Sequence, residues 1–181
     1  MPRISPIDPE NASGRARQLL DDVQEEWGMT PNIVRTLANA PVALEGYLSF
    51  NDALSRGTLG AELREQIAVA VAEGNRCDYC LAAHCAIART VGLSEDAITD
   101  ARRGASPDRK VDAVLDFARQ ILDKRGWVDD DDVARLRDAG YGDREIVEIL
   151  ANVAVSIFTN YFNHVAGTEV DFPQVPQLSG T

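Results

Sequence analysis

Apolar residues recur every three or four positions along most of the chain, and no segment alternates between apolar and polar residues as a half-buried strand does. This spacing predicts amphipathic helices separated by glycine, proline and short polar runs. The expected helices run over residues 13–27, 30–37, 41–56, 63–72, 77–91, 94–103, 107–122, from the acidic run 129–132 onward, and 143–164. The fold class is therefore predicted to be all-α, a compact single-domain helical bundle.

Two of the expected helices are more apolar than a surface helix. The helix 63–72 is almost wholly apolar between Glu65 and Glu73. We expect it to be buried on most sides and the Glu65 carboxylate to have a partner, because an unpaired buried charge is costly. In the helix 143–164 the apolar positions exceed one stripe, so it is either central to the core or shared with another subunit.

Composition divides the chain into an N-terminal arm, one helical domain and a C-terminal tail. Residues 1–12 contain three prolines among polar residues and are expected to form an extended arm that packs on the domain or on a neighbouring chain. The helical domain is expected to span 13–168 and the tail 169–181 to be irregular. At 181 residues and 45% hydrophobic, the chain can bury one substantial core.

The charge and the cysteine content limit the partners and the compartment. The net charge of −11 argues against nucleic acid and against an anionic membrane, because both would repel an acidic surface. No apolar run approaches the roughly 20 residues of a membrane span, and the N-terminus lacks the apolar core of a signal peptide. A cytoplasmic location is expected. There, three cysteines suit a catalytic or metal-binding role better than a structural disulfide framework.

One stretch combines residues that suggest thiol redox chemistry. Cys77 and Cys80 are three positions apart and His84 follows four positions later, so one helix would place all three within an arc of roughly 60°. Asn75 is expected to break the preceding helix, which would put Cys77 in a first helical turn, where the backbone N–H groups favour a thiolate. An antiparallel return of the chain would bring Glu65 back towards His84.

The same residues allow other interpretations. Two cysteines and a histidine could be three ligands of a tetrahedral zinc site, with Glu65 or His164 as the fourth. The cysteine pair could also be two small buried thiols in a non-catalytic helical oligomer, or could exchange disulfides with a partner protein. We prefer the redox disulfide, with no metal and no cofactor.

The motif resembles that of a known family. Glu65, eleven residues, Cys77, two residues, Cys80, three residues and His84 are similar to the signature of the alkylhydroperoxidase D-like, carboxymuconolactone decarboxylase superfamily. The phrases NIVRTLANAPVALEGYLSF, LREQIAVAVAE and NYFNHVAGTEVDFP resemble its peroxidase-related branch, and together they cover most of Asn32–Pro173. The resemblance implies a helical subunit of the alkylhydroperoxidase D-like type that oligomerises through helices into trimers, hexamers or other rings.

The resemblance also implies roles for the site residues. Cys80 would attack hydrogen peroxide or a small organic hydroperoxide, and Cys77 would donate a proton and then close the disulfide. His84 and Glu65 would form the proton relay, and an external thiol or dithiol would reduce the disulfide. Where some members have a histidine between the cysteines this chain has Tyr79, whose hydroxyl is a candidate replacement in the relay.

Two further residues are less directly linked to the motif. His164 ends an apolar helix and is a secondary site candidate, although a helix C-terminus commonly holds a histidine for its dipole. Cys85 points about 140° away from Cys80 on a helix and is expected to be a core thiol.

Overall fold

Every regular element in the part of the chain that the computed structural model describes, residues 1–178, is helical. A short 3-10 turn, η1 (Pro9–Asn11), comes first. The α-helices are α1 (Gly14–Trp27), α2 (Asn32–Leu37), α3 (Pro41–Ser55), α4 (Ala61–Gly74), α5 (Asp78–Thr90), α6 (Glu95–Arg102), α7 (Arg109–Asp123), α8 (Asp130–Asp138) and α9 (Asp143–Ala166). The predicted all-α fold is confirmed.

Most helix ends lie close to the predicted positions because the expected punctuating residues are used. α1 follows Ser13 and ends at Gly28, whose left-handed backbone (φ 73°) closes the last turn. Aspartate is a common N-cap, so Asp143 is the predicted cap of the last long helix, and this prediction is wrong. Gly142, not Asp143, is the N-cap of α9, since the Glu145 carboxylate reaches back to accept the Gly142 N–H at 3.0 Å.

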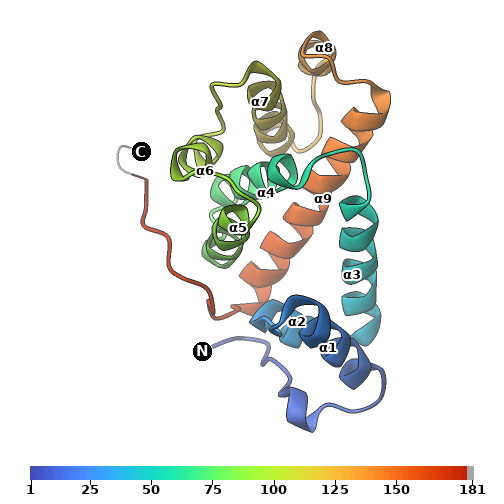
Figure 1. Ribbon diagram of the computed structural model, residues 1–181. Coiled ribbons are helices and arrows are strands. Elements are labelled where there is room, and N and C mark those ends of the chain that lie inside the picture. Colours follow the sequence, from blue (N-terminus) through green and yellow to red (C-terminus); the bar gives the residue numbers. More distant parts are fainter. Residues whose placement is uncertain (179–181) are drawn as a thin grey trace.

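α4 is the central helix of the bundle, as its apolar sequence predicts. Ile67, Val69, Val71 and Ala72 are completely buried. α4 packs against α5, α6, α7 and α9, between which it lies in Figure 1. One apolar cluster joins α4 to α1, α2 and α5, and a second joins it to α7, α8 and α9. Any side chain on α4 is therefore positioned by helices on several sides.

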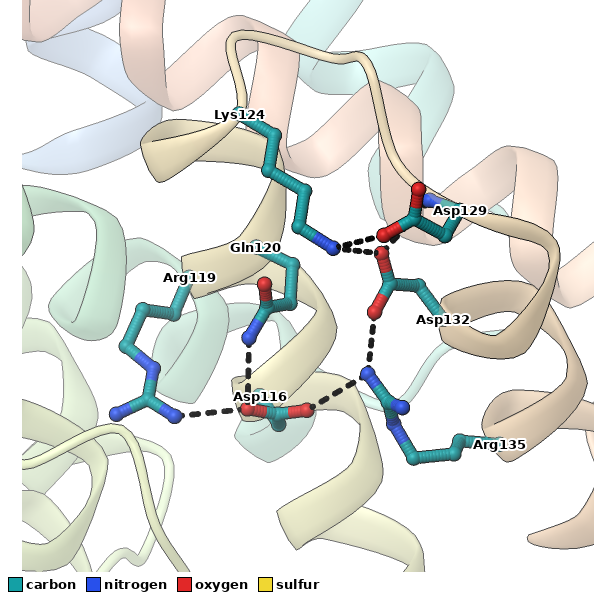
Figure 2. A network of polar contacts seen from close by, with 7 residues as sticks. All are labelled: Asp116, Arg119, Gln120, Lys124, Asp129, Asp132 and Arg135. Carbon is teal, nitrogen blue, oxygen red and sulfur yellow. Dashed lines mark hydrogen bonds and ion pairs between the residues drawn. The ribbon is translucent and has the colours of Figure 1, made fainter.

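The acidic run 129–132 stabilises the start of α8, because carboxylates accept the unpaired N–H groups at a helix N-terminus, and its last aspartate also ties α8 to α7. Asp132 is buried, and its carboxylate accepts from the Asp129 backbone N–H at 2.8 Å and from Lys124 Nζ at 2.6 Å. Arg135 contacts both Asp132 and Asp116, which lies on α7 (Figure 2). This network fixes the short helix on the surface of the bundle.

Both ends of the described chain pack on the domain. The backbone N–H groups of Arg3 and Ile4 donate to the Ala166 carbonyl, at 2.7 and 3.1 Å, so the arm covers the end of α9. In the tail, Asp171 accepts from the Asn32 N–H at 2.7 Å. The predicted packing of the arm on the domain is confirmed. The boundaries between arm, domain and tail, at residues 13 and 168, stay predictions. The last three residues of the predicted tail, 179–181, lie outside the described part of the chain.

α9 ends at Ala166, two residues beyond the predicted end. By length and by a mean hydropathy of 1.2 over 18 residues it could cross a membrane. Its inner face, however, packs on α4, α5 and α7 and carries a row of buried polar residues, which is the pattern of a core helix in a bundle. The buried polar residues are Asn152, Ser156, Thr159, Asn160 and Asn163.

Candidate active site

The two paired cysteines lie at the turn between α4 and α5. At the end of α4 the Arg76 N–H donates to the Glu73 carbonyl at 3.0 Å and the Cys77 N–H donates to the Ala72 carbonyl at 2.9 Å. This Schellman pattern turns the chain at Arg76, whose φ of 55° is left-handed. α5 therefore begins directly after the turn, with Cys77 as its N-cap.

This turn corrects the predicted position of Cys77. Cys77 lies outside the helix, and its Sγ accepts the Cys80 backbone N–H at 3.3 Å. The hydrogen bond with Cys80, together with burial, raises the pKa of Cys77. The backbone N–H at the start of α5 by itself lowers the pKa of Cys77, but the hydrogen bond between the two thiols and burial outweigh it, so the thiolate is favoured on Cys80 rather than on Cys77.

The surroundings of Cys80 stabilise its thiolate. The side chain is 3% exposed, and Asn163 Nδ2 donates to its Sγ at 3.2 Å. The hydrogen bond with Cys77 lowers the pKa of Cys80 to about 6, against the opposing effect of burial. The charge of His84 and the amides of Asn163 and Asn160 act in the same direction. The Cys80 thiol is therefore more readily ionised at neutral pH than an ordinary cysteine.

His84 and Glu65 form the pair expected from the antiparallel return. His84 Nδ1 and Glu65 Oε2 are 2.8 Å apart, and their side chains are 25% and 17% exposed. Burial lowers the pKa of His84, but the Glu65 carboxylate and the Cys80 charge outweigh it and raise that pKa above its ordinary value. The carboxylate fixes one ring nitrogen, so the other is the nitrogen that can exchange a proton.

Two asparagines of α9 belong to the site and were not identified from the sequence. Asn163 contacts the Cys80 sulfur, and Asn160 is completely buried beside it with its Oδ1 accepting from Asn75 Nδ2 at 2.9 Å. The sequence did contain a signal for them: asparagine recurs along α9 on the face that its apolar pattern predicts to be buried. The phrase NYFNH contains both residues.

A cavity of about 40 Å³ lies beside the ion pair, between α3, α4, α5 and α9. Its lining includes Tyr47, Arg64, Glu65, His84 and Ser156. Burial, followed by the charges of Cys80 and Glu65, raises the pKa of Tyr47 to about 12, so its hydroxyl stays protonated. Since about 10–15 Å³ is enough for one water, the cavity has room for a few waters or a molecule of similar size.

The two secondary candidates have other contacts. The Tyr79 hydroxyl accepts the Ile33 backbone N–H at 3.1 Å, and its ring packs edge-on against Phe172. His164 is exposed, with Nε2 3.3 Å from the Arg76 carbonyl oxygen. The structure thus places Tyr79 against α2 and His164 at the turn before Cys77, and their roles in a relay stay predictions.

The structure also bears on Cys85 and on the zinc interpretation of the motif. Cys85 is completely buried in the core, and burial raises its pKa, which agrees with a core thiol. All three cysteines are free. Within residues 1–178, no group of three or more histidine, cysteine, aspartate or glutamate side chains converges in a way that could hold a metal ion.

The central part of the chain matches a known family. The sequence model of the carboxymuconolactone decarboxylase family matches residues 41–124, which extend from α3 to the end of α7. These residues include the ion pair and both paired cysteines, whereas Asn160 and Asn163 lie beyond them. Among curated proteins, none matches the sequence significantly.

Solved structures extend the similarity to nearly the whole chain. One is an alkylhydroperoxidase AhpD core, an uncharacterized peroxidase-related protein from Ralstonia eutropha JMP134. It is 27% identical over 94% of this chain and 92% of its own, with a TM-score of 0.83. An uncharacterized peroxidase-related protein from Silicibacter sp. TM1040 is 25% identical over 92% and 91%, with a TM-score of 0.80.

A third structure shares the fold at lower identity. It is the debrominase Bmp8, solved as a C82A variant in complex with 2,3,4-tribromopyrrole. It is 18% identical over 93% of this chain and 91% of its own, with a TM-score of 0.80. The same fold is therefore found both in a debrominase and in proteins described as peroxidase-related.

Proposed function

Because the chain belongs to the alkylhydroperoxidase D-like, carboxymuconolactone decarboxylase superfamily, we propose that it is a thiol-dependent peroxidase that cycles through a Cys77–Cys80 disulfide. Its substrates are hydrogen peroxide and small organic hydroperoxides. The observation that carries this proposal is the Cys80 thiol, which contacts Cys77 and Asn163 near the His84–Glu65 pair and has a lowered pKa.

The first step oxidises Cys80. The thiolate attacks one peroxide oxygen, the O–O bond breaks, and an S–O bond forms as the sulfur loses two electrons. The departing hydroxide or alkoxide takes a proton from His84, whose protonated form is stabilised by the Glu65 carboxylate. Tyr47, a neutral donor in the adjoining cavity, is available to orient the peroxide.

The second step closes the disulfide. The Cys77 sulfur attacks the Cys80 sulfur, the S–O bond breaks, and the Cys77 thiol proton leaves with the oxygen as water. The raised pKa of Cys77 keeps that proton on the thiol until the sulfenic acid has formed. An external thiol or dithiol, as the reducing cytoplasm provides, then restores both thiols by exchange.

The test is to map the cysteines of the reduced, metal-free protein before and after one equivalent of hydrogen peroxide. We expect a Cys77–Cys80 disulfide within seconds while Cys85 stays a free thiol. Only Cys77 and Cys80 contact each other, and Cys80 is the cysteine whose pKa is lowered. Digestion and mass spectrometry identify the bond. A pair that stays reduced contradicts the proposal, and oxidation by a disulfide-bonded peptide alone favours exchange with a partner protein.

We also propose that the protein is a homo-oligomer that assembles through α9. An apolar stripe with spacings of three or four residues runs along the exposed side of this helix, opposite the polar row. Such a seam is typical of helices that pair with another helix. The α9 stripe consists of Val147, Leu150, Ala154, Phe158, Tyr161 and Val165.

Charged substitutions in the α9 stripe are expected to separate the subunits. Leu150→Glu and Tyr161→Glu place a carboxylate in the seam, where it would lose its hydration, so the mass in solution should fall to the 19.7 kDa of one chain. Trp127→Glu is the matched control, because Trp127 is 85% exposed outside the stripe. Light scattering after size exclusion measures the mass. A wild-type chain that is already monomeric refutes the proposal.

A further inference from the structure

Two polar atoms beside the reacting sulfur have no partner in the reduced protein. Asn160 Nδ2, a donor that faces the Cys80 sulfur closely enough to lower its pKa but not in hydrogen-bond geometry, and Asn163 Oδ1, an acceptor, are buried without a hydrogen bond in residues 1–178. Their side chains are 0% and 4% exposed. Unsatisfied buried polar groups are rare and call for an explanation, which at an active site is often a species that forms there during the reaction.

The other atom of each amide is already bonded, which fixes the direction of both side chains. Asn160 Oδ1 accepts from Asn75 Nδ2 at 2.9 Å, and Asn163 Nδ2 donates to the Cys80 sulfur at 3.2 Å. The free donor and the free acceptor thus belong to two amides one helical turn apart on α9, both beside the same sulfur.

We propose that Asn160 and Asn163 bind the oxygen of the Cys80 sulfenic acid, an inference that rests on the proposed peroxidase function. A sulfenic acid brings one oxygen that accepts a hydrogen bond and one O–H that donates one. The oxygen accepts from Asn160 Nδ2 and its O–H donates to Asn163 Oδ1. Both unpartnered atoms are then satisfied, while Asn163 Nδ2 keeps its contact with the sulfur.

The chemistry balances without another reactant. The thiolate and hydrogen peroxide give the sulfenic acid and hydroxide, which takes the His84 proton and leaves as water. The new oxygen comes from the peroxide and stays on Cys80 until the Cys77 sulfur displaces it. The two asparagines touch this oxygen, which makes them catalytic residues, whereas Asn75 acts through Asn160 and is a positioning residue.

The lifetime of the sulfenic acid tests the proposal. In Cys77→Ser the resolving thiol is absent, so one equivalent of hydrogen peroxide should produce a chain heavier by one oxygen, followed over time by intact-mass spectrometry. We expect Asn160→Leu in this background to shorten the lifetime of that adduct about fivefold or more, since one hydrogen bond is lost. Asn75→Ala removes the hydrogen bond that orients the Asn160 amide, at a residue that is only half-buried, and should also shorten the lifetime of the adduct.

The control and the contradictory outcomes are distinct. Thr168→Val removes another buried, unpartnered polar atom, Oγ1, at the end of α9, and should leave the lifetime unchanged. The inference is overturned if the adduct lives equally long with and without the Asn160 amide. It is also overturned if Thr168→Val shortens the lifetime as much as Asn160→Leu does. Absence of any oxygen adduct in Cys77→Ser overturns the proposed function instead.

Discussion

Replacing Cys80 with serine is expected to abolish peroxide-dependent turnover, with a loss of kcat/KM of at least about a thousandfold. The surroundings lower the pKa of a thiol to about 6, but no such shift makes a serine hydroxyl an anion at pH 7. The serine oxygen also cannot form the sulfenic acid on which the second step depends. The loss is therefore in the chemical step and should appear in kcat as well as in kcat/KM.

The two other cysteines are controls with different expected results. Cys77→Ser should lose multiple turnover but still consume one equivalent of peroxide per chain, because Cys80 remains. Cys85→Ala should keep its activity, since Cys85 is a buried core thiol. Stopped-flow consumption of peroxide with dithiothreitol as reductant measures all three. Full turnover in either Cys77→Ser or Cys80→Ser contradicts a dithiol mechanism.

Replacing Glu65 with glutamine is expected to reduce kcat/KM at pH 7 by about a hundredfold and to move its rise to higher pH. The Glu65 charge raises the pKa of His84, and the charge of His84 in turn lowers the pKa of Cys80. The native thiolate is present above about pH 6 and is lost as the pH falls through that value. Without the carboxylate the pKa of His84 falls and that of Cys80 rises, so the thiolate appears only at higher pH.

The pH dependence of Cys80 alkylation by iodoacetamide follows the same titration without a catalytic cycle. Glu73→Gln is a matched control because Glu73 is on α4 too, but pairs with Arg102 at 2.6 Å. It removes the same charge and should leave the Cys80 profile in place. If the midpoint in Glu65→Gln equals that of the native protein, the pair does not control the thiolate.

Local pattern was sufficient for the helices and for the residues of the motif. The spacing of Cys77, Cys80 and His84 falls within a few turns of chain, and the apolar run around Glu65 indicated a buried helix that returns antiparallel. The exact position of Cys77, at the N-cap rather than in the first turn, was not predictable, because the left-handed Arg76 is not a glycine and gives no turn signal.

The part of the site on α9 required tertiary structure. Asn163 and Cys80 are 83 positions apart, and no periodicity in either helix states which neighbour a polar residue will face. The asparagines did occur on the buried face of an apolar helix, where a polar side chain needs a partner. Polar residues on a predicted buried face are a sequence signal for a site, but they do not identify the Cys80 sulfur as the partner.

The position of α9 at the end of the bundle has a consequence for the protein while it is being made. A ribosome produces Cys80 long before Asn163, so for that interval the thiol lacks one of the donors that lower its pKa. A smaller fraction of the thiol is then thiolate, which is the form that reacts with oxidants. The reactivity of Cys80 towards oxidants should therefore rise when α9 docks.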